Sequence, residues 1–238
     1  GSVTGVQTCA LPISETVAPH GCIGRSGCRL SASLAGAGAV PSDMIILKTP
    51  DEIAVMAQAS RVVAETLQIL KKSVRPGITT DELDRLAEEE IRSRGAKPAF
   101  KGYRSYPKTL CASVNEQVVH GIPSKRVLKE GDIIGLDLGA IVGGFYGDSA
   151  ITVAVGQMTE QNARLVQVTE EAMYLGIKQA VVGHRLSDIS HAVQQHVESA
   201  GYSVVTEFVG HGIGRQLHEE PQAGSRSEER RVGKECRS

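Results

Sequence analysis

The sequence predicts an α+β fold with an internal pseudo-twofold repeat. Two segments of helical periodicity, each a long helix, a break and a shorter helix, recur with an offset of 106 residues, so that Gly77 matches Gly183. Extended segments rich in apolar and β-branched residues follow each helix pair, and a Val142-Gly143-Gly144 connection between two of them indicates a hairpin. Strands segregated from helix pairs are typical of the α+β class.

The first helix pair has strong boundary signals. Thr49 is expected to cap a helix over 50–73, with Pro50 at its first position and two acidic residues in its first turn. Helical spacing predicts inward-facing Ile53, Met56, Val63, Leu67 and Leu70. After a break at Arg75-Pro76-Gly77, Thr79 and Glu82 form a capping box that opens a second helix, with Leu83, Leu86, Ala87 and Ile91 inward and Gly95 at its end.

The second helix pair repeats this pattern. A helix is expected over 160–180, and Ser187 is expected to cap the next one, which carries Ile189, Val193 and Val197 and ends at Gly201. Matching caps favour a duplication, although any two amphipathic helix pairs share such spacing. Strands are expected over 109–119, 133–141, 145–155 and 202–209.

The hairpin carries the strongest chemical signal. If Val142-Gly143 forms the two-residue turn, Asp137 and Asp148 face each other directly. Opposed carboxylates repel, and in an apolar hairpin each also has a desolvation cost. A divalent cation would remove both problems. The alternative places both side chains on a solvated face, with the register one residue off.

Three histidines in turn-bounded contexts add to this signal. His211 lies between glycines after a predicted strand, His218 follows it by seven residues, and His120 ends an extended segment before Gly121. A lone histidine in such a place is more often structural, but three beside an aspartate pair favour a metal site. Nucleophile-elbow, Walker and dinucleotide-binding motifs are absent from the sequence.

Composition limits the classes of partner. The 238 residues are 41% hydrophobic and 22% charged with a net charge of −1, which is ordinary for a soluble domain and gives no electrostatic footprint for nucleic acid. We expect no membrane partner, because no apolar stretch approaches the roughly 20 residues of a span. Five scattered cysteines argue against a disulfide framework and favour the cytoplasm.

The ends of the chain differ in character from its body. Residues 1–43 are rich in Gly, Ala and Ser without periodicity, and residues 223–238 are charged and aperiodic. We expect a disordered leader over 1–43 and a tail over 223–238, both foreign to the natural protein, around a catalytic domain over 44–222. Native disordered tails are the alternative.

The motifs resemble type I methionine aminopeptidases from about Met44 to Gln222. The resemblance rests on Asn115-Glu116 through Pro123, Asp137, Gly147-Asp148, Gly210 through Gly214, and His218 through Pro221. It implies the pita-bread fold, here with an incomplete second half, and removal of the initiator methionine from nascent chains near the ribosome. We expect a monomer.

The resemblance also implies roles for individual residues. Asp137, Asp148 and His211 would bind two divalent metal ions, whose identity among Co, Mn, Fe and Zn the ligands do not decide. His120 and His218 would hydrogen-bond the substrate and the tetrahedral intermediate. The methionine side chain would lie in a soft apolar pocket. Its lining would be Phe100, Tyr103, Tyr106, Cys111 and Leu217.

One departure from the family affects activity. The family completes its metal pair with two more glutamates beyond the His218-Glu219-Glu220-Pro221 segment, and one of them is the general base; neither is found here. We therefore expect a fragment that is inactive as written and has an exposed sheet edge. The alternatives are another pita-bread peptidase, specific for proline, or a non-catalytic pita-bread binding protein.

Overall fold

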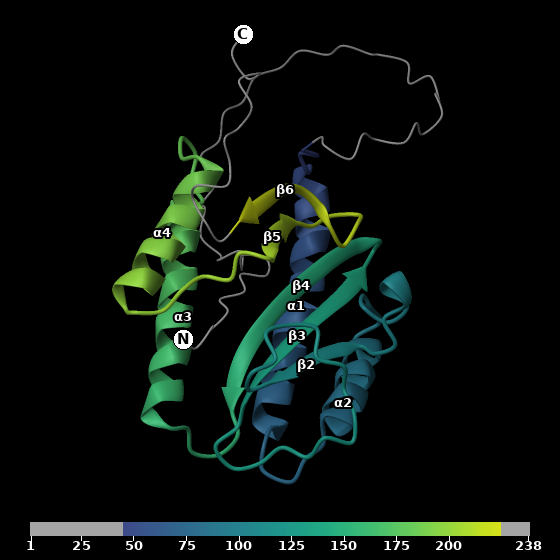
Figure 1. Cartoon of the computed structure of the whole chain (residues 1–238). Helices are drawn as coiled ribbons and strands as arrows, with labels where there is room; N and C mark the ends of the chain where they lie inside the picture. The colour runs from purple at the N-terminus through teal and green to yellow at the C-terminus, as the bar shows by residue number, and fades with distance from the viewer. Residues whose placement is uncertain (1–44, 225–238) are drawn as a thin grey trace, which may run out of the picture.

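The computed structural model describes residues 45–224 (Figure 1). The expected leader over 1–43 and most of the expected tail lie outside the described residues. The helices are α1 (Pro50–Ser73), α2 (Thr80–Ser93), α3 (Glu160–Gln179) and α4 (Leu186–Ser199), with a short 3₁₀ turn at Tyr103–Ser105. The strands are β1 (Lys97–Pro98), β2 (Leu110–Val114), β3 (Ile133–Val142), β4 (Phe145–Ala154), β5 (Val209–Gly212) and β6 (Glu219–Gly224), the last running two residues past the expected boundary at Gln222.

The helices form as their boundary signals predict. Thr49 caps α1 and Thr79 caps α2, each in a complete capping box with the glutamate three residues later. Val63, Leu67 and Leu70 of α1 and Leu83, Ala87 and Ile91 of α2 are buried, whereas Ile53 is exposed because the buried stripe of α1 begins at Ala59. In the second half α3 begins and ends as expected. Ser187 is not a cap: α4 begins at Leu186, and the Asp188 carboxylate accepts a hydrogen bond from Arg185 N at 2.7 Å.

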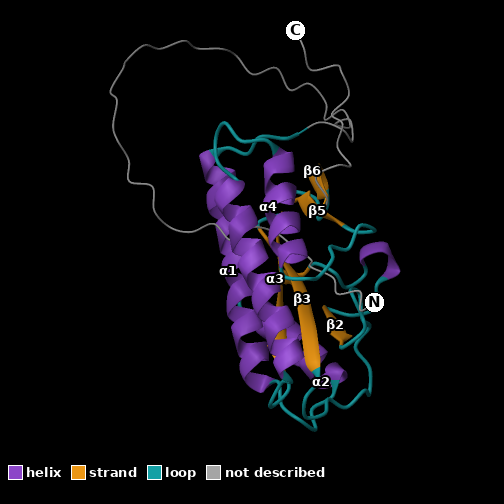
Figure 2. Cartoon of the chain, turned by 60° about the vertical axis from the view of Figure 1, so that its left-hand side comes forward, coloured by secondary structure: helices purple, strands orange, loops and turns teal. Residues whose placement is uncertain are grey.

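Helix α1 is the core helix of the first half. It packs across β3 and β4 and beside α2 (Figures 1 and 2). By length and composition it is the one described helix that could cross a membrane, so the sequence-based expectation of no such stretch is too strict. Its apolar face is used for packing here, because Val63, Leu67 and Leu70 lie in one buried cluster with Leu136 and Leu138 of β3.

The main sheet is antiparallel, with β3 between β4 on one side and β2 and β1 on the other. Four even-numbered residues of β3 are fully buried and form the core under α1 and α2, namely Ile134, Leu136, Leu138 and Ala140. The odd-numbered residues of β3 and the even-numbered residues of β4 share the opposite face, which we call the site face.

The hairpin turn differs from the prediction. Gly143 and Gly144 form the two-residue turn with φ of 57° and 83°, and Val142 pairs with Phe145. Positive φ at both turn positions suits glycine and disfavours a β-branched residue, so the predicted Val142-Gly143 turn is wrong. Consequently Asp137 pairs with Ala150 and Asp148 pairs with Gly139. The residue opposite each aspartate is therefore two positions away from the predicted one. A register shift of two residues keeps both aspartates on one face of the sheet.

The second half has less sheet than expected. Helices α3 and α4 pack on each other, and α4 packs on the two-stranded β5–β6 sheet (Figure 2). The strand expected over 202–209 is wrong, since the chain is irregular there and β5 starts at Val209. The strand expected over 109–119 is shorter, because Asn115 with φ of 56° turns the chain after Val114.

Candidate metal centre and substrate pocket

The two aspartates are diagonal neighbours on the site face. Asp137 of β3 lies opposite Ala150, and Asp148 of β4 lies opposite Gly139, so their side chains point to the same side one step apart. Across the other edge of β3, Asp137 pairs with Cys111 of β2. Backbone pairing therefore places a thiol and two carboxyl groups side by side. Contrary to the sequence-based prediction, the two aspartates are not directly opposed across the hairpin.

The environment of this pair disfavours two negative charges. The Oδ1 atoms of Asp137 and Asp148 are shielded from water and have no hydrogen-bond partner among the described residues. Burial raises the pKa of Asp137 well above its usual range, and the neighbouring Asp148 raises it further. Burial likewise raises the pKa of Asp148, to about 6, against the lowering influence of His211 and Asp137. Without a cation the pair favours sharing a proton.

His211 approaches the pair from β5. Its Nε2 atom lies 3.6 Å from Asp148 Oδ2, and its Nδ1 atom lies 3.0 Å from the carbonyl oxygen of Gly212. A carbonyl can only accept, so Nδ1 carries the proton in the neutral ring and the lone pair of Nε2 faces the carboxylate. Gly212 allows β5 to approach β6 closely, because a Cβ atom there would lie 2.7 Å from the Glu220 carbonyl oxygen.

These three side chains suit a divalent cation chemically. Two unpartnered carboxylate oxygens and an imidazole lone pair are donors that first-row metal ions accept. Within residues 45–224, no three His, Cys, Asp or Glu side chains already surround one point that could hold a metal ion. The donors instead lie beside one another, Asp137 next to Asp148 and Asp148 next to His211.

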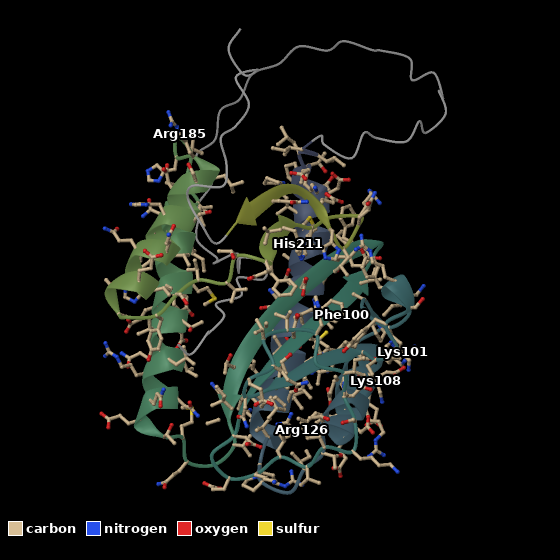
Figure 3. The ribbon with its side chains drawn as sticks, viewed as in Figure 1. Phe100, Lys101, Lys108, Arg126, Arg185 and His211 are labelled. Atoms are coloured by element: carbon tan, nitrogen blue, oxygen red, sulfur yellow. The ribbon has the colours of Figure 1, made fainter. Side chains whose placement is uncertain are left out.

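The predicted pocket residues lie together beside this centre. Ala99, Phe100, Cys111 and Leu217 form a buried cluster, against which Tyr103, Tyr106, Ile141 and Tyr146 pack. Phe100 packs over Gly139, where a Cβ atom would lie 2.7 Å from its ring, and so covers the site face next to Asp148. Figure 3 shows Phe100 and His211 on the same side of the hairpin.

Polar atoms of the pocket are directed to specific partners. The Tyr106 hydroxyl donates to the Leu110 carbonyl oxygen at 2.9 Å, which fixes the ring against β2. Burial, together with the nearby Asp137 charge, raises the pKa of the Cys111 thiol to about 12, so the thiol stays neutral. The pocket wall is therefore uncharged, aromatic and sulfur-containing.

His218 lies between the pocket and His211. Its Nδ1 atom is 2.9 Å from the Tyr103 hydroxyl, and its ring centroid is 4.2 Å from that of His211. Burial is the main cause that lowers the pKa of His218 to about 4, with the adjacent His211 adding to it. At neutral pH the ring is therefore uncharged.

His120 reaches the site from the segment that follows β2. Its φ of 57° is a left-handed conformation, and its ring meets Phe208 edge-on at 5.9 Å. It shares with Asp137 the lining of an open cavity of about 600 Å³ between the site face and α3. The structure thus brings His120 to the same cavity as Asp137, where it is among the groups that lower the pKa of His218.

Sequence reasoning missed several residues that hold the site in place. The carboxylate of Asp84, buried on α2, accepts hydrogen bonds from the backbone N–H groups of Thr109 (2.8 Å) and Leu110 (2.9 Å), where β2 begins. Lys48 and Glu219 form an ion pair across 171 residues of sequence. An acidic residue on the apolar face of α2 is a signal that could have revealed Asp84; no local pattern indicates the ion pair.

Known proteins with similar sequences share one family. The sequence model of metallopeptidase family M24 matches residues 54–235. A methionine aminopeptidase of Clostridium acetobutylicum is 53% identical over 180 residues, which are 75% of this chain and 72% of the relative. Methionine aminopeptidase 1 of Bacillus subtilis is 53% identical over 179 residues, with the same coverage of both chains.

Solved structures agree with this relationship. A methionine aminopeptidase of Thermotoga maritima superposes with a TM-score of 0.76 at 46% identity, covering 77% of this chain and 74% of that one. A prolidase of Pyrococcus furiosus reaches a TM-score of 0.68 at 22% identity, which indicates the fold alone. The α+β pita-bread fold expected from the sequence is confirmed.

Proposed function

The chain belongs to the methionine aminopeptidases of metallopeptidase family M24, and on that premise we propose that it removes the N-terminal methionine of polypeptides by metal-dependent hydrolysis. The observation that carries the proposal is a pair of buried carboxylates with unpartnered oxygens directly beside a soft, uncharged pocket. The carboxylates supply a site for cations, and the pocket suits a thioether side chain.

Asp137, Asp148 and His211 are the proposed metal ligands. Asp137 and Asp148 offer the unpartnered oxygens, and the His211 Nδ1–H bond to the Gly212 carbonyl keeps Nε2 free as a donor. Bound divalent ions would polarise the scissile carbonyl and lower the pKa of a coordinated water. We propose two ions, as the resemblance implies, among Co, Mn, Fe and Zn.

His218 and His120 are the proposed donors to the substrate. With the Tyr103 hydroxyl as donor to its Nδ1 atom, a neutral His218 has Nε2–H available for an oxygen that gains negative charge. His120 lines the cavity next to Asp137, where it can bind the peptide beyond the scissile bond. Phe100, Tyr103, Tyr106, Cys111 and Leu217 would enclose the methionine side chain.

The proposed substrates are nascent chains with an N-terminal methionine, processed by a monomer in the cytoplasm near the ribosome. The proposed catalytic domain begins at residue 44 and includes β6, which ends at Gly224, and residues 1–43 are proposed to be foreign to it. The resemblance implies five metal ligands, whereas the described residues bring three together. We therefore propose that the 238-residue chain binds metal weakly and has little activity of its own.

A substrate and metal assay tests these proposals. The chain would be stripped with chelator, reloaded with each metal singly, and assayed for methionine release from Met-Ala-Ser and for cleavage of Ala-Pro peptides. We expect metal-dependent binding of methionine, lost in Asp148→Asn, with low turnover confined to Met-Ala-Ser. Cleavage of Ala-Pro alone would indicate a proline-specific peptidase, and binding of neither methionine nor metal would favour a non-catalytic protein.

A further inference from the structure

The loop that carries Leu217 and His218 is held by the N-terminal end of α1. This loop, residues 213–218, connects β5 to β6. Lys48 directly precedes Thr49, the cap of α1, and its Nζ atom contacts the Glu219 carboxylate at the start of β6. The Lys48 and Glu219 side chains are 14% and 6% exposed. Such enclosure keeps water from screening the pair.

The Glu219 carboxylate also bonds the loop itself. Its Oε1 atom accepts from the backbone N–H of Gln216 at 3.0 Å, and Gly214 N donates to the Gln216 carbonyl oxygen at 3.1 Å. Gly214 packs against both partners of the ion pair. A Cβ atom there would lie 2.5 Å from Lys48 Cε and 2.6 Å from the Glu219 carboxylate oxygens. The loop therefore folds around the ion pair, with Leu217 and His218 on the adjoining residues.

A second, exposed ion pair joins the same two segments. Arg215 lies 3.2 Å from Glu52 in the first turn of α1, and these side chains are 65% and 28% exposed. Exposed pairs contribute little, whereas breaking a buried pair leaves an uncompensated charge. The pairs differ in burial, and the Arg215 guanidinium also lies 4.3 Å from the centre of the Phe145 ring, where the side chain of Arg215→Met can still pack; Arg215 therefore offers the control for Lys48.

We propose that Lys48 is a positioning residue for the active site: through the Glu219 carboxylate it fixes the 213–218 loop and so places Leu217 in the pocket and His218 beside His211. The inference rests on the proposed function for the roles of Leu217 and His218. The placement itself rests only on contacts, namely Lys48 with Glu219, Glu219 with Gln216, and His218 with Tyr103 and His211.

Substitutions at Lys48 and Arg215 in the full 238-residue chain test the proposal. The readouts are hydrogen exchange of the Gln216 amide, the affinity for free methionine, the affinity for Zn²⁺ and the melting temperature. In Lys48→Met we expect Gln216 exchange to accelerate, and methionine binding to weaken, by on the order of tenfold. Zn²⁺ affinity should change by less than about twofold, because Asp137 and Asp148 lie on the main sheet and His211 is held by the pairing of β5 with Gln222 of β6. Arg215→Met should change each readout by less than about twofold.

Two further variants separate positioning from stability. Lys48→Met with Glu219→Gln leaves no buried charge unpaired, so it should melt like the wild type yet keep the faster Gln216 exchange and weaker methionine binding. Lys48→Arg retains the charge, so its Gln216 exchange rate and its methionine affinity should lie between those of Lys48→Met and those of the wild type. Wild-type exchange and affinity in the double variant would overturn the proposal. Failure of the wild type to bind methionine would refute the proposed function instead, and Gln216 exchange would still test the positioning role.

Discussion

Replacing Asp148 by Asn should stabilise the chain without metal and abolish its stabilisation by metal. Asp148 is 6% exposed, its Oδ1 atom has no partner, and Asp137 lies beside it. An amide of nearly the same size removes the charge that burial penalises. Because metal ions bind the ionised carboxylate, the same substitution removes a ligand.

The magnitude follows from the pKa of Asp148. A rise from 3.8 to about 6 is about two pKa units, which corresponds to about 3 kcal/mol of cost for the ionised form in the folded chain. Between these pH values folding raises proton binding at Asp148, so the contribution of this group to metal-free stability is fully present below pH 3.8 and is lost as pH rises through about 6. At neutral pH we expect the substitution to recover about 1–3 kcal/mol, or roughly 3–10 °C in melting temperature.

Thermal unfolding at neutral pH, with chelator and with excess Zn²⁺, measures both effects. Wild type should gain about 2.7 kcal/mol at a metal concentration 100 times the Kd, and Asp148→Asn should gain none. Glu89→Gln, on the exposed surface of α2, should stay within about 0.5 kcal/mol of wild type in both conditions. If metal-free Asp148→Asn has a lower melting temperature than the wild type, the folded chain stabilises the ionised carboxylate of Asp148. That result would refute the claim that burial makes this charge unfavourable.

Three other substitutions test neighbouring parts of the site. Tyr103→Phe removes the hydroxyl 2.9 Å from His218 Nδ1, and we expect the imidazole ¹⁵N signals of His218 to report a mixture of tautomers, with no change in Zn²⁺ affinity. Asp84→Ala leaves two backbone N–H groups at the start of β2 without an acceptor and should cost about 2–4 kcal/mol in denaturant unfolding. Gly139→Ala places a Cβ atom 2.7 Å from the Phe100 ring and should cost about 1–3 kcal/mol, with weaker methionine binding; an unchanged midpoint would contradict the packing.

Helix boundaries could be predicted from the sequence because their signals are local. Thr49 with Glu52 and Thr79 with Glu82 complete each capping box within four residues, and the structure contains both. The prediction of Ser187 as the cap of α4 is wrong, because the backbone N–H of Arg185 donates the hydrogen bond that opens this helix to the Asp188 carboxylate. Ser or Thr is the commoner partner in that motif, so the pattern alone favoured the wrong residue.

The face of the sheet that the two aspartates share could be predicted from the sequence, whereas their strand pairing could not. A shift of two in the hairpin register left Asp137 and Asp148 on one face, so the inference that a cation belongs there did not depend on the turn. The pocket joins Phe100, Cys111 and Leu217 from three distant segments, and only the resemblance grouped them before the structure did. Lys48 and Glu219 were not foreseen, since no periodicity links residues 171 apart.

The strand that carries Asp148 is rigid for a reason that lies on the opposite face of the sheet. At Gly147 a Cβ atom would lie 2.6 Å from the backbone carbon of Ala59, so the backbone of α1 packs directly against β4 one residue before the aspartate. On the site face Gly139, which pairs with Asp148, is covered by Phe100 and Ala99. The Asp148 backbone is thus enclosed from both faces and cannot move away from Asp137 to relieve their repulsion. Since separation is prevented, the charge must be neutralised locally, by a shared proton at low pH or by a bound cation at neutral pH. Packing by α1 therefore supports the proposal that the carboxylate pair binds a cation.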